Sequence, residues 1–198
     1  MMVHVAVTGN MGCGKTTVCK MLISLGVPVY FSDNRAKDLM NQDQFLIEKI
    51  QQRFGEESYL HGALNRKWLA ERVFKDSKAL TDLNNLVHPV VHKDYLQWST
   101  QQTEDLIAYE SAIVLEQGSQ GNFDTVILVS CPEKLRIERI QERDGLTLEE
   151  IQLRMRFQWS DEKKRMHADY IIENIDISDA NQQLRSALAM IRKQFLID

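Results

Sequence analysis

Cysteine, proline and glycine are all scarce in this sequence of 198 residues, which contains three, three and nine of them. The cysteines have no paired spacing with histidines, so neither a disulfide framework nor a zinc site is indicated, and we expect three reduced thiols. Low-complexity linkers and internal repeats are also missing. We therefore expect one compact domain with a buried core, and not two independent domains.

Long hydrophobic runs and an excess of basic charge are absent as well. No apolar stretch approaches the roughly 18 to 20 residues that span a bilayer, and the N-terminus lacks the basic region and cleavage site of a signal peptide. The formal net charge of -4, with 43% hydrophobic and 26% charged residues, does not favour nucleic-acid binding. We expect a cytoplasmic protein without membrane or nucleic-acid partners. Its oligomeric state stays open between a monomer and a small homo-oligomer.

The most informative segment that is present is Gly9-Asn10-Met11-Gly12-Cys13-Gly14-Lys15-Thr16, which matches the pattern G-x-x-x-x-G-K-[ST]. An apolar run at 3–7 precedes it as a short buried strand would, and a helical pattern at 17–23 follows it. The three glycines let backbone N–H groups converge on phosphate oxygens at the positive end of that helix. This context favours a phosphate loop that binds a nucleoside triphosphate over an ordinary glycine-rich turn.

Two side chains of this loop have predicted tasks. Lys15 is expected to reach the β- and γ-phosphates, and the Thr16 hydroxyl to bind a Mg²⁺ ion that bridges the same phosphates. A nucleoside triphosphate is thus the expected co-substrate and Mg²⁺ the expected cofactor. The residues of the loop predicted to bind the triphosphate are Asn10, Met11, Gly12, Cys13, Gly14, Lys15, Thr16 and Thr17.

Other apolar runs indicate that strands alternate with helices. The further strand candidates are residues 27–31, 106–109, 125–130 and 170–172. Such alternation predicts an α/β fold with a parallel sheet, here of five strands. The run at 125–129 is mostly apolar, as expected for a central strand covered on both faces. A last helix at 178–195 is expected to pack on the sheet.

Two long insertions interrupt this alternation. The first has helical periodicity and no strand signal, and it predicts a mostly helical lobe. In the second, Pro132 begins a helix, Gly145 interrupts it and 147–150 open another helix with a capping box. The predicted parts of the single domain are a core of 1–34, 104–135 and 168–198, a helical substrate lobe at about 35–103 and a lid at about 136–167.

The second insertion is rich in arginine. A segment that closes over a triphosphate excludes water, and one well-placed arginine can raise the rate by about 10³ to 10⁵. A solvated helical face is the plainer alternative. The arginines concerned are Arg136, Arg139, Arg143, Arg154, Arg156 and Arg165.

Missing motifs narrow the class of enzyme. The sequence contains no Asp-x-x-Gly and no Asn-Lys-x-Asp, both of which a GTPase switch needs. A mechanochemical ATPase usually needs a larger sheet and partner subunits, so a small-molecule kinase is favoured.

The chain resembles one family over nearly its whole length, the dephospho-coenzyme A kinases. The resemblance is carried by the phosphate loop, Gly26-Val27-Pro28-Val29 with Asp33, Leu64-Asn65-Arg66, Val73-Phe74, Leu83-Asn84, His88-Pro89, Glu110-Ser111-Ala112, Leu115-Glu116-Gln117-Gly118, Arg139, Arg143-Asp144-Gly145, Arg154, Gln158, Ala168-Asp169-Tyr170-Ile171-Ile172 and Asn174. It implies a P-loop nucleotide kinase-like three-layer fold. The implied reaction is transfer of the ATP γ-phosphate to the ribose 3′-hydroxyl of dephospho-coenzyme A, the last step of coenzyme A synthesis.

The resemblance also implies catalytic residues. Asp33 would be the general base, a role in which a carboxylate raises the reaction rate by a factor of about 10² to 10⁴. From spacing alone, Ser32 or Asp33 could instead be a helix N-cap. Lys15 and Arg139 would complete the catalytic set. Arg139 and Arg143 share a helical face because they are four residues apart, and Arg143 would contact ATP.

The remaining implied contacts concern the two substrates. Arg66, His88 and Glu110 would bind dephospho-coenzyme A together with Asp33, although His88 precedes a proline and could simply mark a helix boundary. Asn174 would contact the adenine of ATP, with a turn role as the alternative.

Four positions depart from the family pattern. Phe31 stands where an acidic residue is common, two residues before the implied base, so the resemblance implies no metal or acceptor contact at that position. Ala112 replaces a usual proline, and Ile175-Asp176 follows Asn174 where small residues are frequent.

Two other functions stay open from the residues alone: a kinase for another small metabolite, and a slowly hydrolysing regulatory protein.

Overall fold

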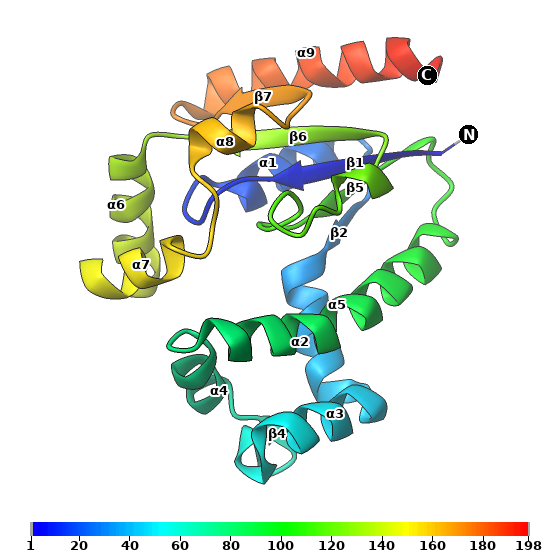
Figure 1. The fold of residues 1–198 in the computed structure, drawn as a ribbon. Coiled ribbons are helices and arrows are strands. Elements are labelled where there is room, and N and C mark those ends of the chain that lie inside the picture. Colours follow the sequence, from blue (N-terminus) through cyan, green and yellow to red (C-terminus); the bar gives the residue numbers. More distant parts are fainter. Residues whose placement is uncertain (1, 198) are drawn as a thin grey trace. The chain divides into compact units, whose positions relative to one another are not determined.

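A computed structural model describes residues 2–197 and contains a five-stranded sheet in the order β2-β5-β1-β6-β7 (Figure 1). The strands are β1 (Val3–Thr8), β2 (Val29–Phe31), β5 (Leu106–Glu110), β6 (Thr125–Ser130) and β7 (Tyr170–Glu173). The pairs β1–β5, β1–β6 and β6–β7 are parallel. All five strands lie where the sequence predicts them, and the predicted α/β class is confirmed.

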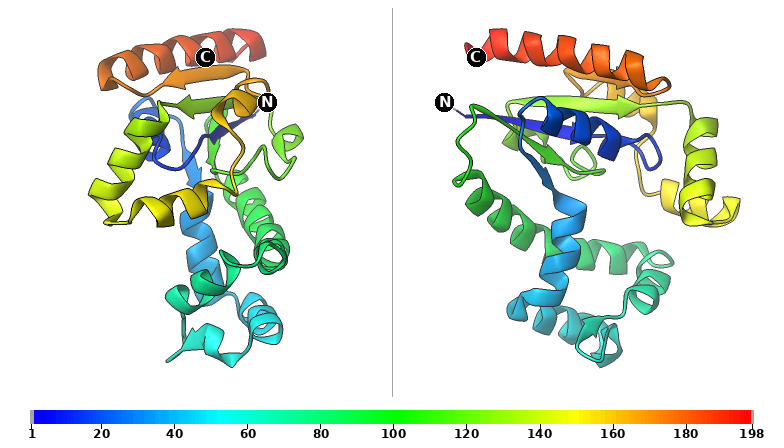
Figure 2. Two further views of the ribbon diagram at one scale, coloured as in Figure 1. Left: turned by 60° about the vertical axis from the view of Figure 1, so that its left-hand side comes forward. Right: turned by 180° about the vertical axis from the view of Figure 1, so that it is seen from behind.

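Helices cover both faces of this sheet, which explains why its central strands are apolar without alternation. Every residue of β6 is buried. Helix α1 (Lys15–Ser24) contacts β1 and α9 (Ile177–Phe195), and the short α8 (Asp161–Arg165) contacts β6 from the opposite face (Figure 2). A parallel sheet enclosed in this way buries its apolar side chains on both faces.

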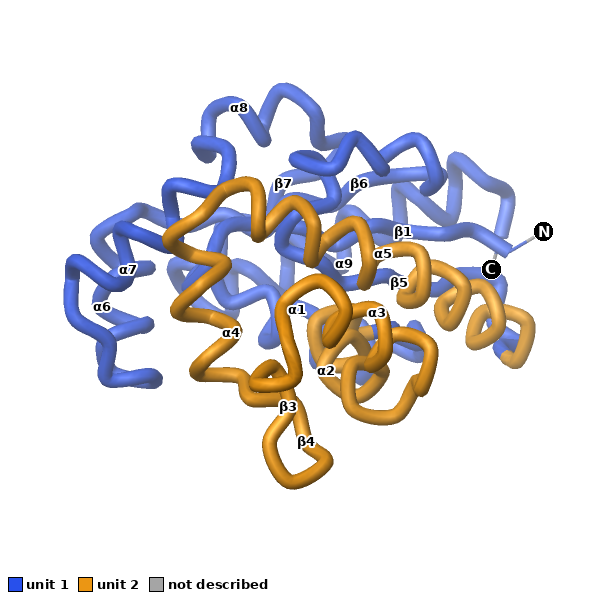
Figure 3. Tube along the Cα trace, turned by 60° about the horizontal axis from the view of Figure 1, so that its bottom comes forward, with its two compact units in different colours: residues 1–30, 102–198 blue, residues 31–101 orange. Residues whose placement is uncertain are grey.

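The contacts divide the chain into two compact units, residues 1–30 with 102–198 and residues 31–101 (Figure 3). The first unit holds the sheet and the phosphate loop. The second covers most of the segment predicted as a helical lobe. The chain passes from the first unit to the second at the end of β2, because α2 (Ser32–Gln42) begins at the next residue.

The second unit is mostly helical, with its own small core. Its further elements are α3 (Gln44–Phe54), a 3-10 turn (Glu56–Ser58), β3 (Tyr59–Leu60), β4 (Ala63–Leu64), α4 (Arg66–Val73) and α5 (Ser77–Ser99). Leu69, Val73 and Ala79 are the buried centre of a cluster that aromatic and leucine side chains surround. Nonpolar burial of this kind stabilises the unit by about 25 cal/mol per Å².

Two details of this unit differ from the sequence prediction. The hairpin of β3 and β4 was not predicted, because two-residue strands leave no period-2 pattern to detect. Its turn, His61-Gly62, has φ of 52° and 79°, the backbone of a type I′ turn. Helix α2 also starts earlier than the predicted limit of 35, directly after the sheet.

The lid segment consists of α6 (Glu133–Asp144) and α7 (Leu148–Met155), followed by α8. Gly145 ends α6 in the left-handed conformation at φ 65°, and Thr147 and Glu150 form the predicted capping box at the start of α7. A second 3-10 turn spans Gln120–Asn122.

All three cysteines are free thiols, and all three are buried. Within residues 2–197, no helix combines the length and apolar character needed to cross a membrane.

Candidate active site

The phosphate loop joins β1 to α1 with a backbone that requires glycine. Gly9, Gly12 and Gly14 have φ of 152°, 82° and 86°. A Cβ atom on Gly9 would lie 2.2 Å from the carbonyl oxygen of Val129, and one on Gly14 would lie 2.1 Å from Nδ2 of Asn174. Neither position has space for a side chain, so the loop is held closely against β6 and the segment after β7.

Lys15 lies at the start of α1 with its ammonium turned back over the loop. Its Nζ donates a hydrogen bond to the Gly9 carbonyl oxygen at 3.0 Å and is 4.0 Å from Glu110 Oε1. Glu110 ends β5, the neighbour of β1, and is only 6% exposed. Thr16 is exposed in the first turn of the helix. The structure therefore brings Lys15, the loop and Glu110 together at the carboxyl ends of two adjacent strands.

A small cavity of about 190 Å³ opens beside the helix end of the loop. Arg139 of α6 donates from Nη1 to the Asn174 carbonyl oxygen at 3.0 Å, and Asn174 Nδ2 donates to the Cys13 carbonyl oxygen at 2.8 Å. Asn174 is thus buried and bonded to the phosphate loop. The cavity is lined by Gly14, Thr17, Arg139, Asn174, Ile175 and Ile177. A planar guanidinium and exposed isoleucine side chains on one cavity suit a flat heteroaromatic ring.

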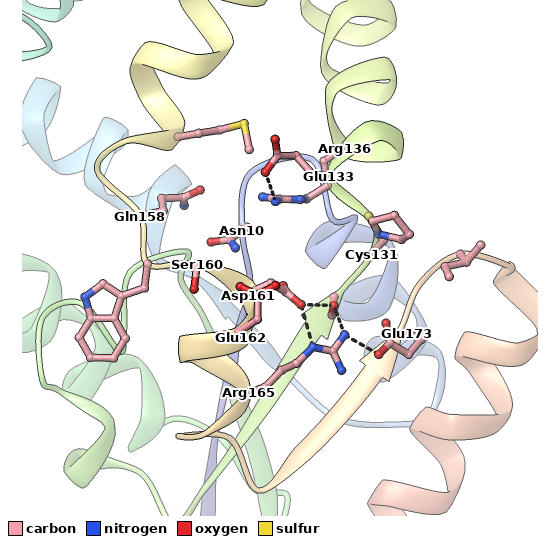
Figure 4. A pocket seen from close by; sticks show the side chains of 15 residues that line it. Asn10, Cys131, Glu133, Arg136, Gln158, Ser160, Asp161, Glu162, Arg165 and Glu173 are labelled. Atoms are coloured by element: carbon pink, nitrogen blue, oxygen red, sulfur yellow. Dashed lines mark hydrogen bonds and ion pairs between the residues drawn. The ribbon is translucent and has the colours of Figure 1, made fainter.

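The first residues of the loop face a second, larger cavity of about 650 Å³ (Figure 4). Asn10 is buried and its Oδ1 atom accepts no hydrogen bond within the described residues. The Met11 amide donates to Gln158 Oε1 at 2.9 Å. Arg136, which is 5% exposed, also lines this cavity, and its Nη2 atom lies 3.5 Å from Glu133 Oε2. This cavity is therefore polar on the side of the loop.

The six arginines of the second insertion do not form one group. Arg139 is connected to the phosphate loop through Asn174, as described above. Arg143 is paired with Asp144 at 2.7 Å, and its side chain is 64% exposed. This guanidinium holds the pKa of the Asp144 carboxyl below its usual value through a hydrogen bond. Arg165 belongs to α8 and forms ion pairs with Asp161 and Glu173. The structure therefore places Arg139 and Arg136 beside the loop, and Arg165 on the cavity that Asn10 also lines, whereas Arg143 is exposed and paired with Asp144.

The predicted base lies in the second unit. Asp33 is in the first turn of α2, whose N-cap is Phe31 and has no side-chain cap bond. The alternative that Ser32 or Asp33 caps this helix is therefore wrong, because both residues are already helical. Phe31, the departure from the family pattern, ends β2 itself.

His88 lies in the middle of α5, and Pro89 is inside the same helix. The alternative that His88 marks a helix boundary is therefore wrong. Burial lowers the pKa of His88, and the nearby charge of Asp33 raises it in opposition. The structure thus brings His88 and Asp33 within electrostatic range. Arg66 is exposed as the first residue of α4.

Sequence reasoning assigned no role to Gln158, Glu116 or Lys164, all of which contact the surroundings of the phosphate loop. Lys164 is fully buried although it stands in the charged run 161–165. A charge run is normally a solvated face, so the sequence holds no signal that one of its lysines is buried.

Three comparisons place these features among known proteins. A family model described as "Dephospho-CoA kinase" matches residues 3–179. A dephospho-CoA kinase of Porphyromonas gingivalis is 40% identical over 154 residues, which cover 78% of this chain and 76% of the relative. The solved structure of TT1252 from Thermus thermophilus has a TM-score of 0.85 and 31% identity over 96% of this chain and 97% of its own. A dephospho-CoA kinase from Campylobacter jejuni has a TM-score of 0.68 and 28% identity over 98% and 99% of the two chains.

Proposed function

The chain belongs to the dephospho-CoA kinase family, and on that premise we propose how its residues carry out the reaction. The protein is an enzyme that phosphorylates dephospho-CoA with ATP in coenzyme A synthesis. The acceptor atom in our proposal is the ribose 3′-hydroxyl. The parts of the site are proposed below one by one.

The phosphate loop is proposed to bind the ATP phosphates through its backbone amides. The observation that carries this proposal is the glycine backbone: Gly9, Gly12 and Gly14 all have positive φ, and α1 begins at Lys15. Amides at a helix N-terminus bind anions because the helix dipole adds to their positive charge. Lys15 would exchange its contact with the Gly9 carbonyl for the β- and γ-phosphates and so neutralise charge during transfer.

Mg²⁺ is proposed as the cofactor, held by the Thr16 hydroxyl and by the phosphates themselves. Mg²⁺ usually binds through one or two protein oxygen ligands together with substrate phosphates. The donor set fits, because Thr16 offers an exposed hydroxyl and Glu110 a carboxylate close to Lys15. When bound, the ion would neutralise phosphate charge.

The small cavity beside Arg139 is proposed to hold the adenine of ATP. The Arg139 guanidinium is fixed by the Asn174 carbonyl oxygen and so presents a flat face. Ile175 and Ile177 offer exposed apolar surface. Asn174 would contribute by fixing the Cys13 carbonyl of the loop. In this geometry Arg139 serves the base end of the nucleotide. Its contact with the transferred phosphate, and that of Arg143 with ATP, stay predictions.

Asp33 is proposed as the general base that takes the proton of the acceptor hydroxyl. It is the second residue after β2, the strand beside β5 in the sheet. The nearby His88, whose pKa burial lowers, would remain neutral at pH 7 and could donate a hydrogen bond to substrate without adding charge. Arg66 offers an exposed cation for the phosphates of the long acceptor. Location in the cytoplasm likewise stays a prediction.

A phosphoryl-transfer assay across acceptors tests this function. Purified protein with Mg²⁺ and ATP should phosphorylate dephospho-CoA and leave adenylate and shikimate unchanged. Transfer to either of these acceptors but not to dephospho-CoA would contradict the proposal. ATP hydrolysis that no acceptor stimulates would instead favour a regulatory nucleotide-binding protein.

A further inference from the structure

A buried lysine in α8 connects two segments that border the phosphate loop. Lys164 has an exposed fraction of 0%, and its Nζ lies 2.9 Å from Glu116 Oε1. The same Nζ donates a hydrogen bond to the Ala112 carbonyl oxygen at 2.8 Å. Both partners belong to the segment that follows Glu110 at the end of β5. One ammonium group therefore fixes α8 to the turn beside Glu110.

Glu116 extends this connection to the phosphate loop. Its Oε1 atom also accepts a hydrogen bond from the Trp159 amide at 2.8 Å. The preceding residue, Gln158, accepts from the Met11 amide at 2.9 Å and is labelled near Asn10 in Figure 4. We call residues 158–165 the return strap, because they lead the chain from the lid back to the sheet.

The other end of the return strap is fixed to two more strands. Arg165 donates from Nη2 to Ser130 Oγ at 2.6 Å and from Nε to Asp161 Oδ2 at 2.8 Å, and it also pairs with Glu173. Ser130 ends β6 and Glu173 ends β7. The strap is thus bonded to the carboxyl-terminal ends of β6, the neighbour of β1, and of β7.

We propose that Lys164 and Glu116 are positioning residues for phosphoryl transfer, which act through Lys15. Lys15 Nζ contacts Gly9 and Glu110. Gly9 lies two residues before Met11, whose amide is bonded to Gln158 of the strap. Glu110 lies two residues before Ala112, whose carbonyl oxygen is bonded to Lys164 of the strap. By holding both segments, the strap fixes the starting position of the ammonium that must reach the transferred phosphate. The inference rests on the proposed phosphate-binding role of Lys15.

Stability alone does not account for this pair. Taking two charges out of water is costly, and well-packed apolar residues often replace a buried ion pair without loss. Burial lowers the pKa of Lys164, and the hydrogen bond and charge of Glu116 raise it in opposition. What an apolar pair cannot supply is the directed bond to the Ala112 carbonyl, and misplacement by about 1 Å can cost about 10² in rate.

The contacts predict an effect on kcat and not on the KM for ATP. The small cavity proposed for adenine shares no residue with the strap or its partners. Binding of the base therefore remains when the strap is altered, whereas the position of Lys15 in the transition state changes. A loss confined to kcat is the signature of an interaction made in the transition state.

The test compares Lys164→Met with a double variant that combines Lys164→Met and Glu116→Gln. The single variant leaves a buried carboxylate without its cation and should be strongly destabilised. The double variant removes both charges and keeps a side-chain oxygen at position 116 that can accept from the Trp159 amide, so its Tm should return close to that of the parent protein. We expect its kcat to stay lowered by about tenfold with the KM for ATP within about twofold. Lys193→Met, at an exposed lysine of α9, is the matched control and should behave like the parent.

Recovery of kcat together with Tm in the double variant would overturn the positioning role, and a rise of the KM for ATP equal to the loss of kcat would overturn it as well. A further variant tests the strap if both Lys164 variants fold poorly. Gln158→Met removes the acceptor of the Met11 amide without leaving a buried charge, so it should lower kcat at a Tm close to that of the parent; an unchanged kcat would count against the strap. Parent protein that fails to phosphorylate dephospho-CoA would contradict the proposed function, whereas an active parent with unaffected variants contradicts only this inference.

Discussion

At the scale of the residue, the phosphate loop depends on glycine for two separate reasons. Gly9 has a φ that side chains rarely adopt, and it also touches the backbone of β6. Gly26 has a positive φ of 81°, but a Cβ atom there would meet nothing within 4 Å. A comparison of Gly9 with Gly26 therefore separates the cost of backbone strain from the cost of a steric clash.

We predict that Gly9→Ala destabilises the protein by more than Gly26→Ala and removes ATP binding. Strain at positive φ costs about 1 to 2 kcal/mol at either position, but only at Gly9 must the Val129 carbonyl move as well. Thermal unfolding and ATP titration of both variants measure this difference. Equal loss of Tm in the two variants would mean that the loop can shift away from β6.

The same scale explains which site residues the sequence could predict. The phosphate loop is contiguous, and its chemistry follows from its own spacing. Lys164 and Glu116 are separated by many residues and meet only through the packing of α8, so no local pattern indicates their contact. Asn174 lies between these cases: the family resemblance implied a nucleotide contact, but its bond to Cys13 needed the fold.

At the scale of the element, helix α7 depends on its capping box. The Thr147 hydroxyl accepts from the Glu150 amide at 3.2 Å, and Glu150 Oε2 accepts from the Thr147 amide at 2.8 Å. A helix of eight residues has little stability of its own, so these terminal bonds matter more than they would in a long helix.

We predict that Thr147→Ala weakens α7 by about 1 kcal/mol, the usual cost of losing an N-cap. Amide hydrogen exchange across Leu148–Met155 should become about fivefold faster, while exchange in β6 stays unchanged. Glu149→Ala changes an exposed residue of the same turn outside the cap and serves as the control. Unchanged exchange in Thr147→Ala would show that packing, and not the cap, holds α7.

The strands of the five-stranded sheet were predictable from the sequence, and the two-residue strands of the β3–β4 hairpin were not. The strands of the sheet have apolar runs of several residues, which the sequence displays directly. The alternative that His88 marks a helix boundary was suggested by Pro89, but α5 continues through this proline, with Val87 and Val91 buried on either side. Burial of that apolar face outweighs the hydrogen bond that proline cannot donate.

At the scale of the whole molecule, the half-buried His88 is expected to make stability depend on pH. Burial lowers its pKa below the ordinary value of 6.5, so the unfolded chain binds this proton more readily than the folded one. The free energy of unfolding therefore has its full contribution from His88 above about pH 6.5 and loses it as the pH falls below that value.

We predict that His88→Asn flattens the fall in Tm between about pH 7.5 and about pH 5. His92→Asn, one turn further along α5 at an exposed position, should keep the slope of the parent protein. Thermal unfolding at several pH values measures both slopes. A parent-like slope in His88→Asn would assign the acid sensitivity to other groups.

The most direct test of the proposed mechanism concerns the carboxylate that must accept the proton. We predict that Asp33→Asn lowers kcat for dephospho-CoA by about 10² to 10⁴ and leaves the dissociation constant for ATP nearly unchanged, because the phosphate loop and the cavity beside Arg139 are in the other unit. Asp38→Asn, at an exposed carboxylate of the same helix that lies 3.8 Å from Arg35, should keep nearly full turnover. Turnover of Asp33→Asn close to that of the parent enzyme would contradict the mechanism.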